Sequence, residues 1–347
     1  MIVLFLILYG LMARSMKVCK GGIYEDYLSK ENTQSIKGVF IIIVFMSHVR
    51  GYAEYSAISD QFVISILDYL GQFMVAMFLF CSGYGVFESF KRKGDQYINS
   101  FPKNRICNTY FDFVIALILW LIFDLVTQTK YSLRTIVLSF TGWDNIGNSS
   151  WYMFVIFTLY IITFVCFKFF KSKPIIAIIA VVIFSLIYIY IIRQVRPSHW
   201  SNTCLCYSFG LLWSYFGEYI NRFLKHIKTY RYYILLCLLF VVYNFLFDLR
   251  YSRLMAFNIA SITFCLLIIV VMMKISFKSK ILLWCGNNLF WIYILQRIPM
   301  AFFYQIGINE YNRYLYLFLC VIFTGILTQF VSTKSEILKR KIWKIQS

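Results

Sequence analysis

The sequence predicts an all-α, polytopic integral membrane protein with ten core transmembrane helices and an additional N-terminal helix. Of its 347 residues, 61% are hydrophobic and 14% are charged, whereas soluble domains are about 45–50% apolar and about 25% charged. Apolar runs close to the length of about 20 residues that crosses a bilayer recur along the whole chain. Because a backbone in lipid must satisfy its own hydrogen bonds, we expect these runs to be helices.

Eleven apolar segments are expected to span the bilayer. The first is short and is followed by basic residues, a pattern that also fits the apolar part of a signal peptide. We favour a retained helix, because no small-residue cleavage site precedes Arg14. The expected spans are 2–13, 38–55, 62–87, 110–127, 151–170, 175–192, 203–220, 232–247, 255–273, 281–304 and 314–331.

Lysine and arginine are distributed unevenly between alternate connections. One side of the predicted membrane carries 25 of the 34 basic residues and the other carries 8, and Arg297 lies within a span. Cytoplasmic loops hold the excess of basic residues, so the predicted N-terminus is outside and the C-terminus is cytoplasmic. We expect a multi-pass protein of the plasma membrane.

The net charge of +19 is therefore explained by topology, and no nucleic-acid partner is expected. Most of the ten cysteines lie in apolar runs, where a thiol behaves as a small apolar group. Cys204 and Cys206 have no second pair at zinc-site spacing, so no metal is expected.

The most informative stretch is SIKGVFIIIVFMSHVRGY, residues 35–52, in which ten residues separate Lys37 from His48. Eleven helical steps return the two side chains to within about 20° of one face, about 16 Å apart along the axis. Lys37 alone would be read as a basic anchor at the membrane boundary. An ionisable group inside a span usually faces a cavity or a partner, which makes His48 a candidate functional residue.

At this stretch the sequence resembles the acyltransferase 3 family of polytopic membrane acyltransferases, whose hallmark is Arg or Lys, ten residues, then His. Lys37 and His48 meet that spacing, with the less common Lys. Further similar pieces follow in the same order. They are GQFMVAMFLFCSGYG (71–85), FPKNRI (101–106), SSWYM (149–153) and GNNLFWIYILQRIP (286–299). Many relatives carry a late histidine where this chain has Gln296.

The resemblance implies transfer of an acyl group, most often acetyl, from acetyl-CoA to a hydroxyl of a sugar or glycan, without a metal. His48 would be the general base, since imidazole titrates near neutral pH, and Lys37 would assist. Arg105, with Lys103 beside it, is a candidate for the donor phosphates; simple placement of basic residues on the cytoplasmic side explains both equally well.

Other polar and aromatic residues in or near the spans have two readings. Each could line the acceptor or acyl site, but helix packing, the interfacial aromatic belt or a solvated loop explains most of them as well. Arg297 is the most suggestive, because Pro299 should kink its helix. Weak substrate-binding candidates are Ser82, Tyr84, Trp151, Tyr152, His199, Trp200, Gln296 and Arg297; possible carboxylate partners of His48 are Asp68, Asp112 and Asp124.

The chain is expected to comprise an N-terminal helix and cytoplasmic linker (1–35), a membrane acyltransferase domain (36–331) and a basic tail (332–347). The acceptor is expected to be a bacterial surface polysaccharide or its lipid-linked precursor. The alternative function is a transporter or flippase for glycan intermediates, in which the same buried charges would line a path. The partners expected are acyl-CoA, a carbohydrate acceptor and the lipid bilayer.

Overall fold

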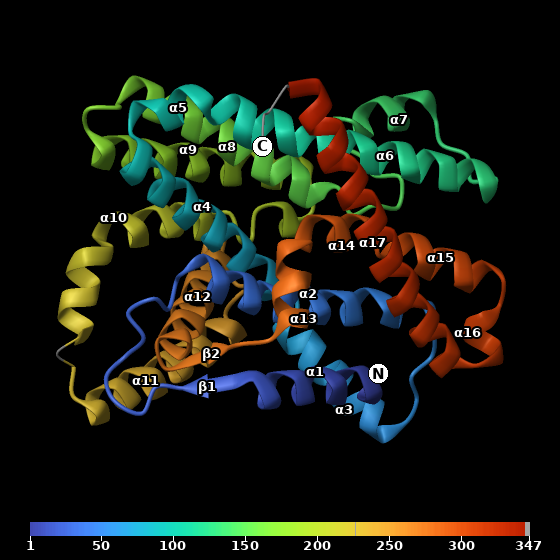
Figure 1. Cartoon of the computed structure of the whole chain (residues 1–347), viewed down its shortest axis with the longest axis horizontal. Helices are drawn as coiled ribbons and strands as arrows, with labels where there is room; N and C mark the ends of the chain where they lie inside the picture. Colours follow the sequence, from blue (N-terminus) through green and yellow to red (C-terminus); the bar gives the residue numbers. More distant parts are fainter. Residues whose placement is uncertain (226, 344–347) are drawn as a thin grey trace.

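The computed structural model describes residues 1–225 and 227–343, and it confirms the all-α class (Figure 1). Among these residues, eight helical segments are long and apolar enough to cross a membrane. They are Lys30–Tyr52, Phe73–Lys93, Asp95–Val126, Trp151–Phe169, Pro174–Val195, Thr229–Asp248, Ala256–Lys274 and Arg313–Ile342. The apolar helix Ile2–Ser15 is shorter.

The first third of the chain contains one departure from the expected spans. Its elements are α1 (Ile2–Ser15), β1 (Met16–Val18), α2 (Lys30–Val49), the 3-10 turn η1 (Arg50–Tyr52), α3 (Ile58–Leu70) and α4 (Phe73–Lys93). The prediction of one span over 62–87 is wrong, because two helices occupy it. Gly71 has a φ of +42° and its N–H bonds the carbonyl of Leu67. This backbone conformation suits glycine and ends α3.

The middle third follows the expected spans more closely. Its elements are α5 (Asp95–Phe101), the π-helical turn η2 (Pro102–Cys107), α6 (Asn108–Val126), α7 (Leu133–Ser139), α8 (Trp151–Phe169), α9 (Pro174–Val195), the 3-10 turn η3 (Ser198–Trp200) and α10 (Leu205–Lys225). The turn η2 joins α5 to α6 without interrupting the helical path, and single π turns often occur at functional sites.

The last third contains a broken helix. Its elements are α11 (Thr229–Asp248), α12 (Ala256–Lys274), β2 (Ile275–Phe277), α13 (Lys280–Asn287), α14 (Leu289–Leu295), α15 (Arg297–Gln305), α16 (Ile308–Tyr311) and α17 (Arg313–Trp343). The expected span over 281–304 is not one continuous helix, since the helix breaks at Asn288 and again at Gln296. The second break confirms the kink expected from Pro299, which cannot bond the carbonyl of Leu295.

The boundaries between the expected domains do not coincide with ends of helices. Residue 35 lies inside α2, and residue 331 lies inside α17, which extends the last span to Trp343. Residues 344–347 of the expected tail lie outside the described residues. Strands β1 and β2 pair antiparallel, with Met16 opposite Phe277, and so fasten the end of α1 to the connection after α12.

Two very close helix crossings position the residues discussed below. A Cβ atom at Gly38 of α2 would lie 1.9 Å from the carbonyl oxygen of Leu282 in α13, and one at Gly286 would lie 1.8 Å from that of Gln34. Gly83 of α4 and Gly210 of α10 make an equivalent crossing, with Cβ positions 2.0 and 2.2 Å from carbonyl oxygens of the partner helix. Only glycine permits such approaches, as in other membrane helix pairs.

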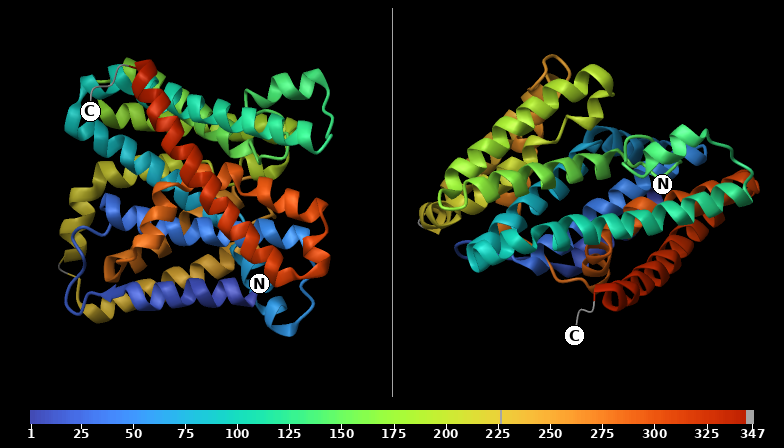
Figure 2. Two further views of the ribbon diagram at one scale, coloured as in Figure 1. Left: turned by 45° about the vertical axis from the view of Figure 1, so that its right-hand side comes forward. Right: turned by 90° about the horizontal axis from the view of Figure 1, so that it is seen from above.

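The two ends of α2 pack against different parts of the apolar core. In Figures 1 and 2, the axes of α1, α2, α6 and α8 are roughly parallel to one another, and α17 crosses them obliquely. The larger apolar core packs around α2, α4, α8, α10 and α12, and a smaller core joins the end of α2 to α3, α15 and α17. The start of α2 and its end therefore lie in different packing environments.

Candidate functional site

His48 lies in the last turn of α2 and contacts the break between α14 and α15. The Gln296 side-chain nitrogen Nε2 is 3.0 Å from His48 Nδ1 and also donates to the carbonyl of Tyr293 at 3.2 Å. Gln296 is fully buried, and its Oε1 atom has no hydrogen-bond partner. With the amide donating to Nδ1, a neutral imidazole carries its proton on Nε2.

A row of aromatic rings leads from His48 toward the interior of the helix bundle. The ring centroid of Tyr293 is 6.3 Å from that of His48 and 5.6 Å from that of Tyr152 in α8. The Tyr293 hydroxyl donates to the carbonyl of Ser149 at 3.3 Å. The pair Tyr293 and Tyr152 therefore separates the imidazole from the space on the other side of the rings.

That space is a chamber of about 210 Å³, called here the inner chamber. Tyr293 and Tyr152 form one end of it, and Ser82, which is hydrogen-bonded to Tyr160 at 2.8 Å, lines its wall. Lys37 and Arg105 bring two cations to its lining. Lys37 lines the inner chamber, whereas His48 does not line it and contacts Tyr293 of its lining.

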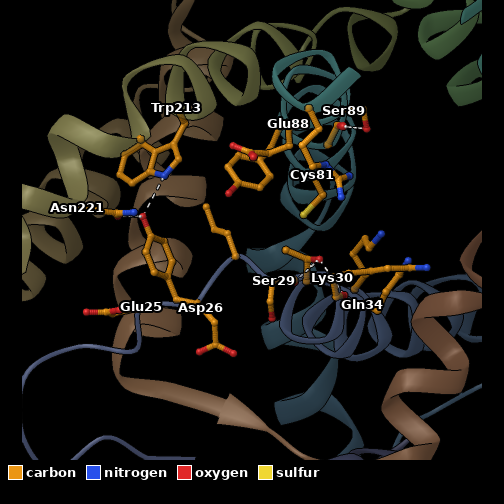
Figure 3. Close-up of a pocket in the computed structure, with 18 of the residues that line it drawn as sticks. Glu25, Asp26, Ser29, Lys30, Gln34, Cys81, Glu88, Ser89, Trp213 and Asn221 are labelled. Atoms are coloured by element: carbon orange, nitrogen blue, oxygen red, sulfur yellow. Dashed lines mark hydrogen bonds between the residues drawn. The ribbon is translucent and has the colours of Figure 1, made fainter. Parts of the chain in front are cut away.

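A larger cavity of about 580 Å³ lies at the start of α2. It is called here the donor cavity after the role that we propose for it below. Figure 3 shows its walls, with Cys81 on α4, Trp213 on α10 and Lys30 at the start of α2. The Tyr27 hydroxyl accepts from Trp213 at 3.3 Å and donates to Asn221 at 2.9 Å, which fixes the wall formed by α10.

The two cavities share three lining residues, Lys37, Cys81 and Arg105. Each comes from a different element, namely α2, α4 and the π-helical turn η2. Arg105 is held in place because its Nε donates to the Tyr97 hydroxyl at 3.0 Å. The junction of the two cavities is therefore lined by two cations and one thiol.

Basic side chains outnumber acidic ones in the donor cavity. Lys30, Arg92, Lys37 and Arg105 line it together with Glu25, Asp26 and Glu88. Glu88 forms an ion pair with Lys91, which does not line the cavity, and accepts a hydrogen bond from Ser214 at 2.7 Å. The lining thus suits a ligand with several negative charges, such as phosphate groups.

The remaining sequence-predicted candidates differ in their positions. Tyr84 lines the donor cavity, and Arg297 is close enough to interact electrostatically with His48. Lys103 is exposed and does not line either cavity, although it lies two residues from Arg105.

The other aromatic candidates lie next to Tyr152, whose ring centroid is 6.0 Å from that of Trp151. The Trp151 ring packs against His199 at 5.3 Å, and partial burial lowers the pKa of His199, which favours a neutral imidazole. Trp200 is buried against Trp143 and Phe154. This cluster stabilises the connection before α10 and leaves no free face of Trp200 for a sugar.

None of the three carboxylates considered as partners of His48 bonds it. Asp68 pairs with Arg50 at 2.6 Å, and Asp112 accepts from Lys339 and Ser335. Asp124 is buried without a partner for its Oδ2 atom. These possible carboxylate partners therefore do not orient His48, and the amide of Gln296 contacts its Nδ1 atom instead.

Sequence reasoning missed Tyr293 and Cys81 as lining residues. Tyr293 precedes Gln296 by three residues and Arg297 by four, so all three share one helix face. That spacing was visible in the stretch 286–299. Cys81 gave no such signal, because an isolated thiol in an apolar run is usually packing.

Comparison with known proteins gives a family. Residues 34–333 match the acyltransferase 3 family, described as an acyltransferase domain. No curated protein and no solved structure matches the chain. The match covers nearly the whole chain, including His48, the lining of the inner chamber and most of the lining of the donor cavity. The protein therefore belongs to the acyltransferase 3 family and is a multi-pass membrane acyltransferase.

Proposed function

We propose that the protein transfers a short acyl group, in the first place acetyl, from acyl-CoA to a hydroxyl of a carbohydrate. The acceptor proposed is a bacterial surface polysaccharide or its lipid-linked precursor. The observation that carries the proposal is the pair of joined cavities, which connects a cationic opening at the start of α2 with the rings beside His48.

The donor cavity supplies what a coenzyme A thioester requires. The phosphates of coenzyme A carry several negative charges, and the basic side chains that line the cavity can hold them by charge-assisted hydrogen bonds. Arg105 and Lys37 would then lie nearest to the narrower inner chamber, which receives the thioester end. A cation at that position also stabilises negative charge that develops on the thioester oxygen.

His48 supplies the proton chemistry. The acceptor oxygen attacks the thioester carbonyl carbon, its proton passes to the imidazole, and the carbon–sulfur bond breaks as the proton is returned to the leaving thiolate. Accepting a proton at Nε2 requires the tautomer with hydrogen on Nδ1. A half-turn of the Gln296 amide supports that tautomer, because the unpartnered Oε1 then accepts from Nδ1–H.

The proposed orientation places the donor cavity on the cytoplasmic side of the plasma membrane and the C-terminus in the cytoplasm. The start of α2 belongs to the side that carries 25 of the basic residues. Cytosolic acyl-CoA would therefore reach Lys37 directly.

The test is transfer of label from radiolabelled acetyl-CoA into surface glycan by membranes that contain the protein. The parent and His199→Gln are expected to label glycan, since His199 lies outside both cavities. His48→Gln is expected to be inactive at equal abundance. The transporter or flippase alternative would instead be established by two results together. The parent would export glycan without labelling it, and His48→Gln would export glycan equally well.

A further inference from the structure

A third cavity, called here the outer cavity, lies beyond the end of α2 and has no role in the chemistry above. Its volume is about 770 Å³. Its walls are η1 and the residues after it on one side, and the end of α15, helix α16 and the start of α17 on the other. These elements lie together at one edge of the molecule in Figure 1.

The outer cavity is lined by aromatic and hydrogen-bonding side chains. Four tyrosines line it, namely Tyr52, Tyr304, Tyr311 and Tyr314. The Tyr52 and Tyr304 rings meet edge to face at 5.8 Å. Tyrosine offers a flat apolar face and a polar tip, and it loses little conformational entropy on binding.

Carboxylates and amides complete the lining. Glu54, Glu310, Asn309 and Asn312 supply acceptors, and the amides also supply donors. The Asn312 side chain accepts from the N–H groups of Tyr314 and Leu315, which caps α17 and fixes this rim. Such a lining matches a ligand with many hydroxyls and flat, weakly polar faces, which is the chemistry of a sugar ring.

The charges of the lining favour one kind of sugar. Two carboxylates, Glu54 and Glu310, are accompanied by a single arginine, Arg313, which lies over the Tyr314 ring and 3.9 Å from Asp60. Neutral or amino sugars are therefore compatible with the cavity. Phosphorylated sugars and uronic acids would be repelled, because like charges at close range are costly.

The outer cavity is also connected to the catalytic base. Tyr52 follows His48 by four residues on one continuous helical path, so the two side chains are neighbours. Arg297 interacts electrostatically with both of them. The donor cavity begins at the other end of α2, which is 20 residues or about 30 Å long.

We propose that the outer cavity is the acceptor subsite and binds neutral or amino-sugar units of the glycan. This inference rests on the proposed function, and it adds the location and the charge preference of the acceptor. Donor and acceptor then approach His48 from opposite ends of α2. A glycan chain held by the tyrosines would present one hydroxyl toward the imidazole.

The experiment measures kinetics with purified protein in nanodiscs, labelled acetyl-CoA and the glycan fraction that the parent labels. Three substitutions change the cavity, Tyr304→Ala, Tyr304→Phe and Glu310→Gln. Tyr251→Ala is the matched control, because Tyr251 is exposed in the connection between α11 and α12 and does not line the outer cavity.

We expect Tyr304→Ala and Glu310→Gln to raise the KM for glycan about five- to tenfold, the loss expected for one stacking or hydrogen-bonding contact. Tyr304→Phe keeps the ring and is expected to stay near the parent. The KM for acetyl-CoA is expected to stay the same in all variants, since the donor cavity lies at the other end of α2.

Three outcomes contradict the proposal. If the cavity variants keep the parental KM for glycan while the parent labels it, the outer cavity is not the acceptor subsite, although the proposed function stands. A uniform loss of kcat and of donor affinity would show a structural role instead. If the parent labels no glycan at all, the proposed function fails, and the acceptor subsite fails with it.

Discussion

Gln296 places its amide nitrogen 3.0 Å from Nδ1 of His48, across 248 residues of sequence. The same nitrogen donates to the carbonyl of Tyr293, a bond that a half-turn of the amide would break. Gln296 therefore controls which imidazole nitrogen carries the proton, and hence whether His48 offers a lone pair or a proton to the substrate.

This contact leads to a test of the tautomer. Gln296→Glu offers only acceptor oxygens to Nδ1 when ionised, which stabilises the tautomer with hydrogen on Nδ1 and a free lone pair on Nε2. We expect this variant to retain or exceed parental kcat. Gln296→Leu removes the contact and is expected to lower kcat about tenfold. The rate of acetyl transfer at equal protein abundance measures the effect of each substitution. Equal rates for Gln296→Leu and Gln296→Glu would contradict the role of Gln296 in setting the tautomer of His48.

The central prediction concerns His48 itself. His48→Ala is expected to lower kcat by about 10²–10⁴-fold, the usual contribution of a positioned acid–base group. His48→Asn and His48→Gln keep polarity without a titratable nitrogen, so neither should restore activity. Initial rates of labelled acetyl transfer measure the loss, and parental activity in His48→Gln would show that imidazole chemistry is not required.

Lys37 is expected to act through its charge. Lys37→Arg keeps a cation at the junction of the two cavities and should retain substantial activity. Lys37→Ala removes it and should raise the KM for acetyl-CoA about 10–100-fold, the loss of one charge-assisted contact. The KM for glycan serves as the internal comparison. An Arg variant as inactive as Ala would mean that Lys37 does more than supply charge.

The glycine crossing of α4 and α10 gives a prediction about stability. Gly83→Ala places a Cβ 2.0 Å from the carbonyl oxygen of Tyr207, so the helices must separate. We expect a loss of about 1–3 kcal/mol, typical of overpacking. Gly85→Ala is the control two residues away, where a Cβ meets no atom within 4 Å. In thermal unfolding in detergent, Gly83→Ala should have a lower melting temperature than Gly85→Ala. Similar melting temperatures for the two variants would contradict the close crossing.

The proposed orientation can be tested by reporter fusions. Fusions after Lys93 and Lys228 should report cytoplasm, and those after Asn145 and Ser198 should report the outside, because basic residues gather on the side of Lys93 and Lys228. Reporter activity in intact cells measures each location. A cytoplasmic signal at Asn145 with an external signal at Lys228 would reverse the orientation.

The sequence by itself determined the helical class, the family resemblance and the common face of Lys37 and His48. Each of these depends on local properties, namely hydropathy over about 20 residues and the 3.6-residue repeat of a helix. The break beside Gln296 could also be predicted from the sequence, since Pro299 lacks an amide hydrogen in any packing environment.

Only the tertiary structure decided which side chains meet. Arg105 faces the cavities and Lys103 does not, because the rotation of a helix about its axis is set by its neighbours. Asp112 accepts hydrogen bonds from Lys339 and Ser335 of α17. The partner of His48 is the side-chain amide of Gln296, at the break after α14. The helical repeat shows which residues share a helix face. The packing of helices at the glycine crossings decides which side chains of other helices contact that face.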